Sequence, residues 1–244
     1  GNAGTAEIAT NHDITTVSDL VHLAFQLDVN LVVVGPEAPL CEGLADKLGN
    51  MEIPCFGPVA GLARLEGSKL HAKQVMQANN VPTADFLIID QATDVDHALD
   101  QYSGNPWVIK RDVLAGGKGV VVTEDRAEAK EFIQQSINSD GKVLLEAFLP
   151  GNEASMLVVM DGSGFVCLPA SQDHKREFEG DKGRNTGGMG AYAPAPVYTQ
   201  EVQEKTIERI VKPMHNALSN RRVPYRGVIY VGLMIDSKND PYVV

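Results

Sequence analysis

The chain has 244 residues, 43% of them hydrophobic, and a formal net charge of −11 at pH 7, which are globular values with room for one large or two ordinary domains. The acidic balance argues against a protein that binds nucleic acid through its phosphates. No apolar stretch approaches the length of a membrane span. Three widely spaced cysteines fit a reduced, cytoplasmic compartment better than a disulfide or zinc framework.

The first 68 residues have an α/β pattern. Apolar residues at helical spacing predict a helix over Val17–Leu27, and Leu31–Val34 predicts a buried strand that ends at a Gly-Pro turn. A second helix over Gly43–Leu48 and a short strand over Ile53–Gly57 complete a parallel unit. Glu37 follows the first strand, where α/β sheets bind ligands. It could equally favour the positive end of the next helix.

Ser68 is a good N-cap for a helix that runs to Asn79 and Asn80. Lys69 and Lys73 lie four positions apart on one face of this helix, and such a like-charge pair is mildly destabilising. An anion near the helix start would offset that cost. Two exposed lysines without partners are the common alternative.

A hairpin with a glycine-rich tip is predicted between Pro106 and Thr123. The apolar run that ends before Lys110 and the valine run Val120–Val122 flank the loop LAGGKG. Glycine has no Cβ, so this loop can approach a ligand closely while Lys118 supplies a cation. A strand follows the loop, unlike the helix that follows a P-loop. The hairpin therefore favours a phosphate-binding flap, and an ordinary surface hairpin is the alternative.

Residues 106–168 are predicted to form one small β-rich module with a covering helix at Arg126–Ile137. Glu146 ends a predicted strand and Glu153 begins the next. A buried carboxylate needs donors, and ribose hydroxyls could supply them. Two solvated strand ends are the alternative.

The tract from Leu168 to about residue 196 is rich in charge and glycine and is predicted to be a long loop, a feature that tends to be functional or disordered. A helix over Thr199–Leu218 should kink at Pro213. Two strands follow, at Gly227–Asp236 and in the final segment PYVV.

Taken together, VGPEAPL, LEGSK, VIKRDVLAGGKGVVV, LLEAFLPGNEAS, SQDHKR and NTGGMGAY resemble the phosphoribosylamine–glycine ligase (glycinamide ribonucleotide synthetase) family of the ATP-grasp superfamily. The resemblance covers the whole chain in order. It implies an α/β fold with an incomplete Rossmann-like N-terminal domain, residues 1–68, and a two-lobed α+β ATP-grasp domain, residues 69–244, whose lid lobe is about 106–168.

The resemblance also implies an ATP-dependent ligase of purine synthesis, acting on glycine and 5-phosphoribosylamine through a glycyl phosphate. Lys110 and Lys118 are implied as catalytic cations, with Lys69 beside them at the phosphates. The other nucleotide-binding residues are implied to be Gly116, Gly117, Gly119, Glu146, Ala147, Phe148 and Glu153. The substrate side is implied to include Glu37, Asp173, Asn185, Thr186, Gly187 and Gly188.

Both ends of the chain differ from the family pattern. The family starts with a strand and a glycine-rich turn that precede the first residue here. It continues into a Glu-x-Asn pair that holds Mg²⁺, expected just beyond Val244, so no metal ligand is assigned within the chain. Two alternatives stay open: another ATP-grasp carboxylate–amine ligase, or a nucleotide-binding fragment without catalysis.

Overall fold

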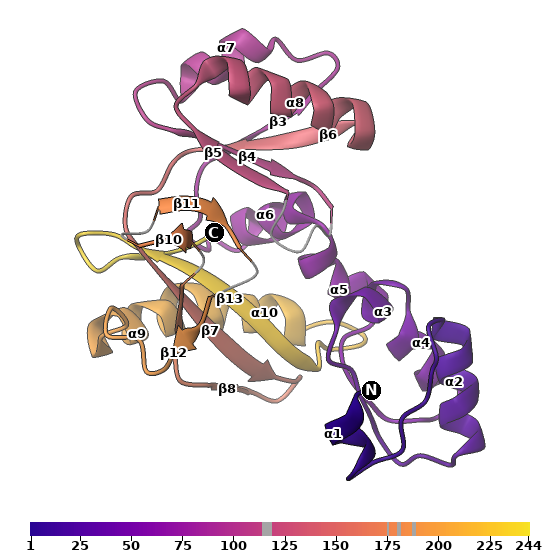
Figure 1. Cartoon of the computed structure of the whole chain (residues 1–244). Helices are drawn as coiled ribbons and strands as arrows, with labels where there is room; N and C mark the ends of the chain where they lie inside the picture. The colour runs from indigo at the N-terminus through magenta and orange to yellow at the C-terminus, as the bar shows by residue number, and fades with distance from the viewer. Residues whose placement is uncertain (114–118, 175, 180–181, 187–188) are drawn as a thin grey trace. The chain divides into compact units, whose positions relative to one another are not determined.

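The computed structural model describes residues 1–113, 119–174, 176–179, 182–186 and 189–244 (Figure 1). The chain divides into two compact units, Gly1–Ala63 and Arg64–Val244.

The first unit is a small α/β unit built on a two-stranded parallel sheet. Its elements are α1 (Ala3–Ala6), α2 (Val17–Gln26), β1 (Val32–Val33), α3 (Glu37–Cys41), α4 (Leu44–Asn50), β2 (Cys55–Phe56) and the start of α5 (Ala60–Gly67). β1 and β2 are parallel, with Val32 opposite Cys55, which confirms the predicted β-α-β alternation. A core cluster of Val17, Ala24, Leu44, Leu48 and Ile53 joins α2 to α4.

The second unit takes in the end of α5 and continues with α6 (Lys69–Ala78) and a four-stranded antiparallel sheet, called here the first sheet. The strands are β3 (Phe86–Asp90), β4 (Trp107–Arg111), β5 (Val120–Thr123) and β6 (Lys142–Glu146), in the spatial order β3-β6-β4-β5. The helices of this sheet are α7 (Val95–Gln101) and α8 (Arg126–Asp140). Buried Ile133 and Ile137 of α8 belong to one core cluster with Ile109 and Leu145 of the sheet. This packing places the sheet's apolar face under α8 and leaves the face of Lys110 for other contacts.

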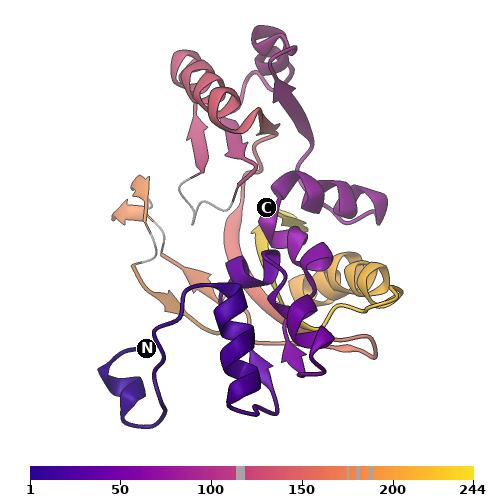
Figure 2. The same ribbon diagram turned by 90° about the vertical axis from the view of Figure 1, so that its right-hand side faces the viewer.

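The other four-stranded sheet of this unit, the second sheet, has the order β14-β13-β7-β8. Its strands are β7 (Asn152–Met160), β8 (Phe165–Cys167), β13 (Gly227–Ile235) and β14 (Pro241–Val243). β13 and β7 pair along their whole length, from Gly227 opposite Met160 to Ile235 opposite Asn152. The helical segment at residues 200–219 lies along one face of this sheet (Figures 1 and 2). Alternation along β7 buries Ala154 and Met156 on that face.

The helical segment is interrupted ahead of Pro213. α9 (Gln200–Thr206) passes into a π-helical turn, Ile207–Val211, and α10 (Lys212–Ser219) resumes with Pro213 in its first turn. Proline has no backbone N–H, and a first-turn position does not need one. The backbone stays right-handed helical on both sides of the π turn, which lies just before Pro213. A bend at Pro213 stays a prediction.

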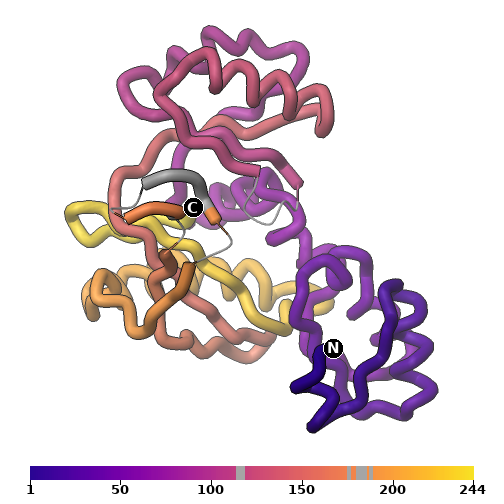
Figure 3. The backbone as a smooth tube through the Cα atoms, in the orientation of Figure 1, coloured from indigo at the N-terminus to yellow at the C-terminus, as the bar shows by residue number. Residues whose placement is uncertain are grey.

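Two predictions about chain organisation are wrong. Residues 106–168 are not one module, because β4, β5 and β6 lie in the first sheet and β7 and β8 lie in the second. Figure 3 traces the chain leaving the first sheet after β6 and entering the second at β7. The tract after Leu168 is not a plain loop either. It contains the short strands β9 (Gln172–Asp173), β10 (Arg176–Phe178), β11 (Lys182–Asn185) and β12 (Ala191–Tyr192).

Those short strands form two small antiparallel ladders, β10 with β11 and β12 with β9. Their polar sequence contains no run of alternating apolar residues, so the usual strand signal is missing. Backbone hydrogen bonds make the ladders instead, and Ser155 of β7 exchanges two such bonds with Ser171 at 2.8 Å each. The tract is thereby tied to the second sheet.

The two sheets are joined close to the end of β14. Thr83 forms a parallel bridge with Val243, and its hydroxyl donates a hydrogen bond to the Val243 carbonyl at 2.7 Å. The Val243 amide in turn donates to the Pro82 carbonyl at 2.9 Å. The segment that leads into β3 is therefore anchored to the second sheet.

Candidate functional site

Three charged side chains meet where α6 and the first sheet come together. Glu146 is the last residue of β6, and Lys110 lies on the neighbouring β4. The register puts Val108 opposite Glu146 and Leu144 opposite Lys110, so Lys110 and Glu146 are diagonal neighbours on one face. Lys110 Nζ is 3.1 Å from Glu146 Oε2, and Lys73 Nζ of α6 is 2.9 Å from the same oxygen.

This cluster is buried. The side chains of Lys73 and Glu146 are 4% and 2% exposed, and that of Lys110 is 13% exposed. Glu146 Oε1 is also buried and has no hydrogen-bond partner within the part of the chain that the structure describes. A buried carboxylate oxygen without a donor is costly. Glu146 Oε1 is therefore an acceptor that the described residues leave unused.

Lys69 lies beside this cluster. It is the first residue of α6, whose N-cap Ser68 accepts a hydrogen bond from the His71 amide at 3.1 Å. Its ammonium donates to the Val113 carbonyl at 3.0 Å. Burial lowers the pKa of Lys69, and the nearby positive charge of Lys110 lowers it further. A bound anion would relieve this repulsion.

Asp112 holds the base of the glycine-rich loop against the same helix end. Its Oδ1 accepts hydrogen bonds from the Ser68 hydroxyl and the Leu70 amide, both at 3.0 Å. A carboxylate at this position satisfies an otherwise unpaired amide and interacts favourably with the positive end of the helix. Asp112 therefore fixes where β4 ends and the loop begins.

The predicted tip of the flap lies largely outside the described residues, which exclude Gly116, Gly117 and Lys118. Gly119 is described and buried, and its carbonyl accepts a hydrogen bond from the Arg111 amide at 2.8 Å. The strands on either side pair from Trp107 opposite Thr123 to Lys110 opposite Val120. The hairpin itself is therefore confirmed, and the role of its tip stays a prediction.

The predicted nucleotide-binding residues after β6 line a connection between the sheets. Ala147 and Phe148 are half-buried, and the Ala147 amide donates to the Asp85 carbonyl at 2.9 Å. Glu153 is the second residue of β7 and is exposed, opposite Met234 of β13. Glu146 and Glu153 thus differ: Glu146 is buried between lysines and is not a solvated strand end.

The residues predicted for the substrate side are only partly described. Asp173 is half-buried on β9 and pairs with Ala191 of β12. Asn185 ends β11, Thr186 is half-buried, and Gly187 and Gly188 lie outside the described residues. Their roles remain predictions.

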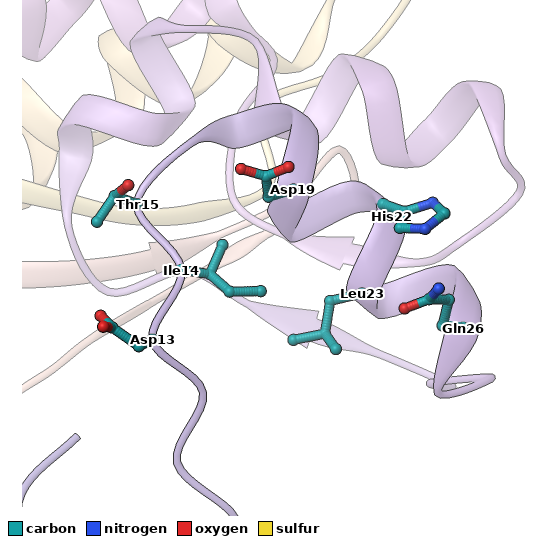
Figure 4. Close-up of a pocket in the computed structure, with 7 residues that line it drawn as sticks. All are labelled: Asp13, Ile14, Thr15, Asp19, His22, Leu23 and Gln26. Atoms are coloured by element: carbon teal, nitrogen blue, oxygen red, sulfur yellow. The ribbon is translucent and has the colours of Figure 1, made fainter.

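Glu37 belongs to the first unit and opens α3 as its first residue. A carboxylate there interacts favourably with the helix dipole. This position agrees with the interpretation of Glu37 as a residue that stabilises the start of the helix, and its role toward a substrate stays a prediction. The same unit has an open hollow of about 300 Å³, lined by Asp13, Ile14, Thr15, Asp19, His22, Leu23 and Gln26 (Figure 4). None of these seven residues is a predicted site residue.

Lys73 and Thr83 belong to the buried charged cluster, and neither was predicted as a site residue from the sequence. The spacing of Lys69 and Lys73 put both on one helix face, but it did not distinguish an exposed lysine from a buried one. Lys73 instead points into the protein, where Thr83 Oγ1 accepts from its ammonium at 2.8 Å. A tertiary contact of this kind leaves no periodic signal in the sequence.

Within the described ranges, no three or more His, Cys, Asp or Glu side chains come together as a metal-binding group. In the same part of the chain, no helix is both long and apolar enough to cross a membrane.

The chain was compared with known families and proteins. Residues 67–244 match the family described as "Phosphoribosylglycinamide synthetase, ATP-grasp (A) domain", and residues 1–66 match its N domain. Phosphoribosylamine–glycine ligase of Mycobacterium bovis is 45% identical over 98% of this chain and 58% of its own length. The enzyme of Escherichia coli O6:H1 is 42% identical over 100% and 59%.

Solved structures agree with this relationship. The crystal structure of phosphoribosylamine–glycine ligase from Thermotoga maritima matches with a TM-score of 0.78 and 32% identity, over 100% of this chain and 60% of that one. An ADP complex of N5-carboxyaminoimidazole ribonucleotide synthetase matches with a TM-score of 0.75 at 18% identity, which bears on the fold alone. The predicted fold class is confirmed. The chain spans somewhat more than half the length of these relatives, and it belongs to the phosphoribosylglycinamide synthetase family.

Proposed function

We propose that this chain carries the nucleotide-binding part of an ATP-dependent ligase that joins glycine to 5-phosphoribosylamine. The products are glycinamide ribonucleotide, ADP and phosphate. The family membership and the name shared by relatives at 42% and 45% identity support this proposal. Because the chain covers 58% and 59% of those relatives, the complete reaction is proposed for the full-length protein.

The reaction needs cations more than it needs a proton-transfer group. A carboxylate is a poor acylating agent, so the glycine carboxylate is first phosphorylated by ATP, and the amine of phosphoribosylamine then displaces phosphate. Positive groups that neutralise the charge on the transferring phosphoryl group lower the barrier of such a step. Lys69, Lys110 and Lys118 are proposed for this role.

The observation that carries the proposal is the convergence of Lys69 and Lys110. Burial lowers the pKa of Lys69, and the charge of Lys110 lies close enough to lower it further. Within the described residues, Glu146 Oε2 is the partner of the Lys110 ammonium, which leaves two of its three donors for a ligand. A polyphosphate offers both the charge and the acceptor oxygens.

The remaining residues are proposed to hold the rest of the ligands. Backbone at Glu146, Ala147 and Phe148 would contact the adenine, and Glu153 the ribose. The glycines of the flap, Gly116, Gly117 and Gly119, would cover the phosphates. The amine and carboxylate substrates would meet Glu37, Asp173, Asn185, Thr186, Gly187 and Gly188.

Magnesium is typical of the family, and the described residues do not form a site for it.

Titration calorimetry with ATP tests the nucleotide site directly. Lys110→Met should weaken ATP binding about tenfold or more, the cost of losing a hydrogen bond to a charged group. The variant should stay folded because Glu146 keeps its ion pair with Lys73. Lys130→Met is the control, since Lys130 is an exposed residue of α8 that pairs with Asp96 of α7. Equal ATP affinity for Lys110→Met and wild type would refute the proposed site.

Phosphate release by the full-length protein tests the reaction. Turnover should require ATP, glycine and phosphoribosylamine together. Turnover with a different carboxylate or amine and none with this pair would favour another ATP-grasp ligase. ATP binding without any turnover would favour a nucleotide-binding protein without catalysis.

A further inference from the structure

Lys73 has no role in the function proposed above, yet it is among the most buried charged residues of the described chain. Its ammonium has three N–H donors, and three acceptors surround it. These are Glu146 Oε2 at 2.9 Å, Thr83 Oγ1 at 2.8 Å and the Ala84 carbonyl at 3.1 Å. With every donor used inside the protein, Lys73 has none left for a phosphate.

Lys73 shares its carboxylate oxygen with Lys110. Oε2 of Glu146 is 2.9 Å from Lys73 Nζ and 3.1 Å from Lys110 Nζ, and Oε1 has no partner among the described residues. The two lysines are thus the contacts that orient this carboxylate. A long lysine side chain has several rotamers to lose, so an anchored Oε2 restricts where the Lys110 ammonium can lie.

Lys73 is itself fixed from the second sheet. The Thr83 hydroxyl accepts from Lys73 and donates to the Val243 carbonyl at 2.7 Å. The Lys73 ammonium also lies 5.8 Å from the centre of the Phe86 ring, within the range of a cation–π contact. One hydrogen-bonded chain therefore runs from β14 through Thr83, Lys73 and Glu146 to Lys110.

We infer that Lys73 is a positioning residue: it holds Glu146, and through Glu146 it places the Lys110 ammonium for a polyphosphate ligand without touching that ligand. This inference rests on the proposed function, because it takes Lys110 as a phosphate-binding group. Burial lowers the pKa of Lys73 and the nearby Glu146 carboxylate opposes that shift, which accords with an ammonium held by this partner.

A double-mutant cycle on ATP affinity tests the inference. The variants are Lys73→Met, Glu146→Gln and the double variant, each measured by calorimetry below the lowest melting temperature. Each single variant should bind ATP at least about tenfold more weakly, because breaking a buried charge pair displaces the remaining group. The double variant should bind within about threefold of Glu146→Gln, since Lys73 then has no carboxylate to act through.

Whether Glu146→Gln weakens or tightens ATP binding shows whether Glu146 acts by positioning Lys110 or by its charge alone. Removing a negative charge beside a phosphate site should tighten ATP binding if only electrostatics mattered. Weaker binding by both Lys73→Met, which removes positive charge, and Glu146→Gln, which removes negative charge, is the result expected of positioning. Tighter binding by Glu146→Gln would overturn the inference.

A conservative pair at Thr83 gives a second test that does not alter charge. Thr83→Ser keeps the hydroxyl and should bind ATP like wild type, whereas Thr83→Val removes it and should bind several-fold more weakly. The surface variant Lys130→Met should not change affinity.

The ATP affinities of wild type, Lys110→Met and Lys73→Met show whether the proposed function fails or only this inference does. If wild type does not bind ATP, the proposed function and this inference both fail. If Lys110→Met weakens binding but Lys73→Met does not, the inference alone fails. A further tenfold loss when Lys73→Met is added to Glu146→Gln would indicate a direct contact between Lys73 and ATP, and would also overturn it.

Discussion

Replacing Glu146 with glutamine should destabilise the protein far more than replacing either of its lysine partners. Lys73, Glu146 and Lys110 carry one net positive charge together. Lys73→Met or Lys110→Met each leave one ion pair at 3.1 or 2.9 Å. Glu146→Gln instead leaves two buried ammonium groups facing each other without a counter-charge.

The size of the effect follows from burial. At about 3 Å and an effective dielectric constant of about 20, each attraction is worth roughly 5 kcal/mol before desolvation is subtracted. Measured losses for breaking one partner of a buried pair are about 3–5 kcal/mol. For a chain of this length each kcal/mol corresponds to about 2–4 °C. The melting temperature of Glu146→Gln should therefore fall by roughly 6–20 °C.

Asp96 provides a matched control, because it is also a carboxylate bound by two cations. Arg126 and Lys130 contact it at 3.0 and 2.8 Å, but its side chain is 56% exposed. Surface pairs contribute little and are screened by salt, so Asp96→Asn should melt within about 2 °C of wild type.

Thermal unfolding followed by circular dichroism at low and high salt measures both variants. The loss in Glu146→Gln should persist at high salt, since the cluster is largely excluded from solvent. A melting temperature for Glu146→Gln within about 2 °C of wild type would show that the reasoning about this cluster is wrong.

Three further predictions concern other parts of the second unit. Burial raises the pKa of Tyr225, so the unfolded chain releases that proton first as pH rises above about 10, and stability falls there. The Tyr225 hydroxyl donates a hydrogen bond to the Val228 carbonyl at 2.9 Å. Tyr225→Phe should lose less stability above pH 10 in urea titrations, at a cost of about 1 kcal/mol near neutral pH for that lost hydrogen bond; an unchanged pH profile would contradict this. A Cβ on Gly151 would lie 2.3 Å from the Ile235 carbonyl oxygen, so Gly151→Ala should cost about 1–3 kcal/mol in chemical denaturation. Gly164→Ala, with no atom within 4 Å of the added group, is its control and should be nearly neutral. Asp112→Ala removes the carboxylate at the start of α6 and should cost about 0.5–2 kcal/mol, read from the melting temperature, and no change in melting would contradict that role.

Local elements were predictable because their causes are local. Ser68 and Thr199 are the N-caps of α6 and α9, a position that serine and threonine favour because their hydroxyls accept hydrogen bonds from first-turn amides. The β-branched run at Val120–Val122 pairs with β4 as a hairpin. Family motifs, which are also contiguous in sequence, were sufficient to predict the fold class. In each case the determining residues lie within a few positions of one another.

Contacts between distant segments decided the rest. Nothing near β7 in the sequence specifies that it pairs with β13, more than sixty residues later, so the division of residues 106–168 between two sheets was missed. The short strands after Leu168 have polar sequences, and their ladders depend on backbone hydrogen bonds that any residue type can make.

The candidate site divides in the same way. Lys69, Lys110 and Glu146 could be named as candidates from the sequence, because each lies in a contiguous motif of the family. The burial of Lys73 was not, since a lysine at helical spacing has the same signal whether it faces solvent or protein. Its environment comes from Thr83, Ala84 and Glu146, which are brought together only when α6 and the end of β6 pack against each other. The sequence by itself determined which chemical groups this protein has and which local elements carry them. The tertiary structure decided which of these groups are desolvated and paired, because burial and ion pairing depend on the packing of segments that are distant in the chain.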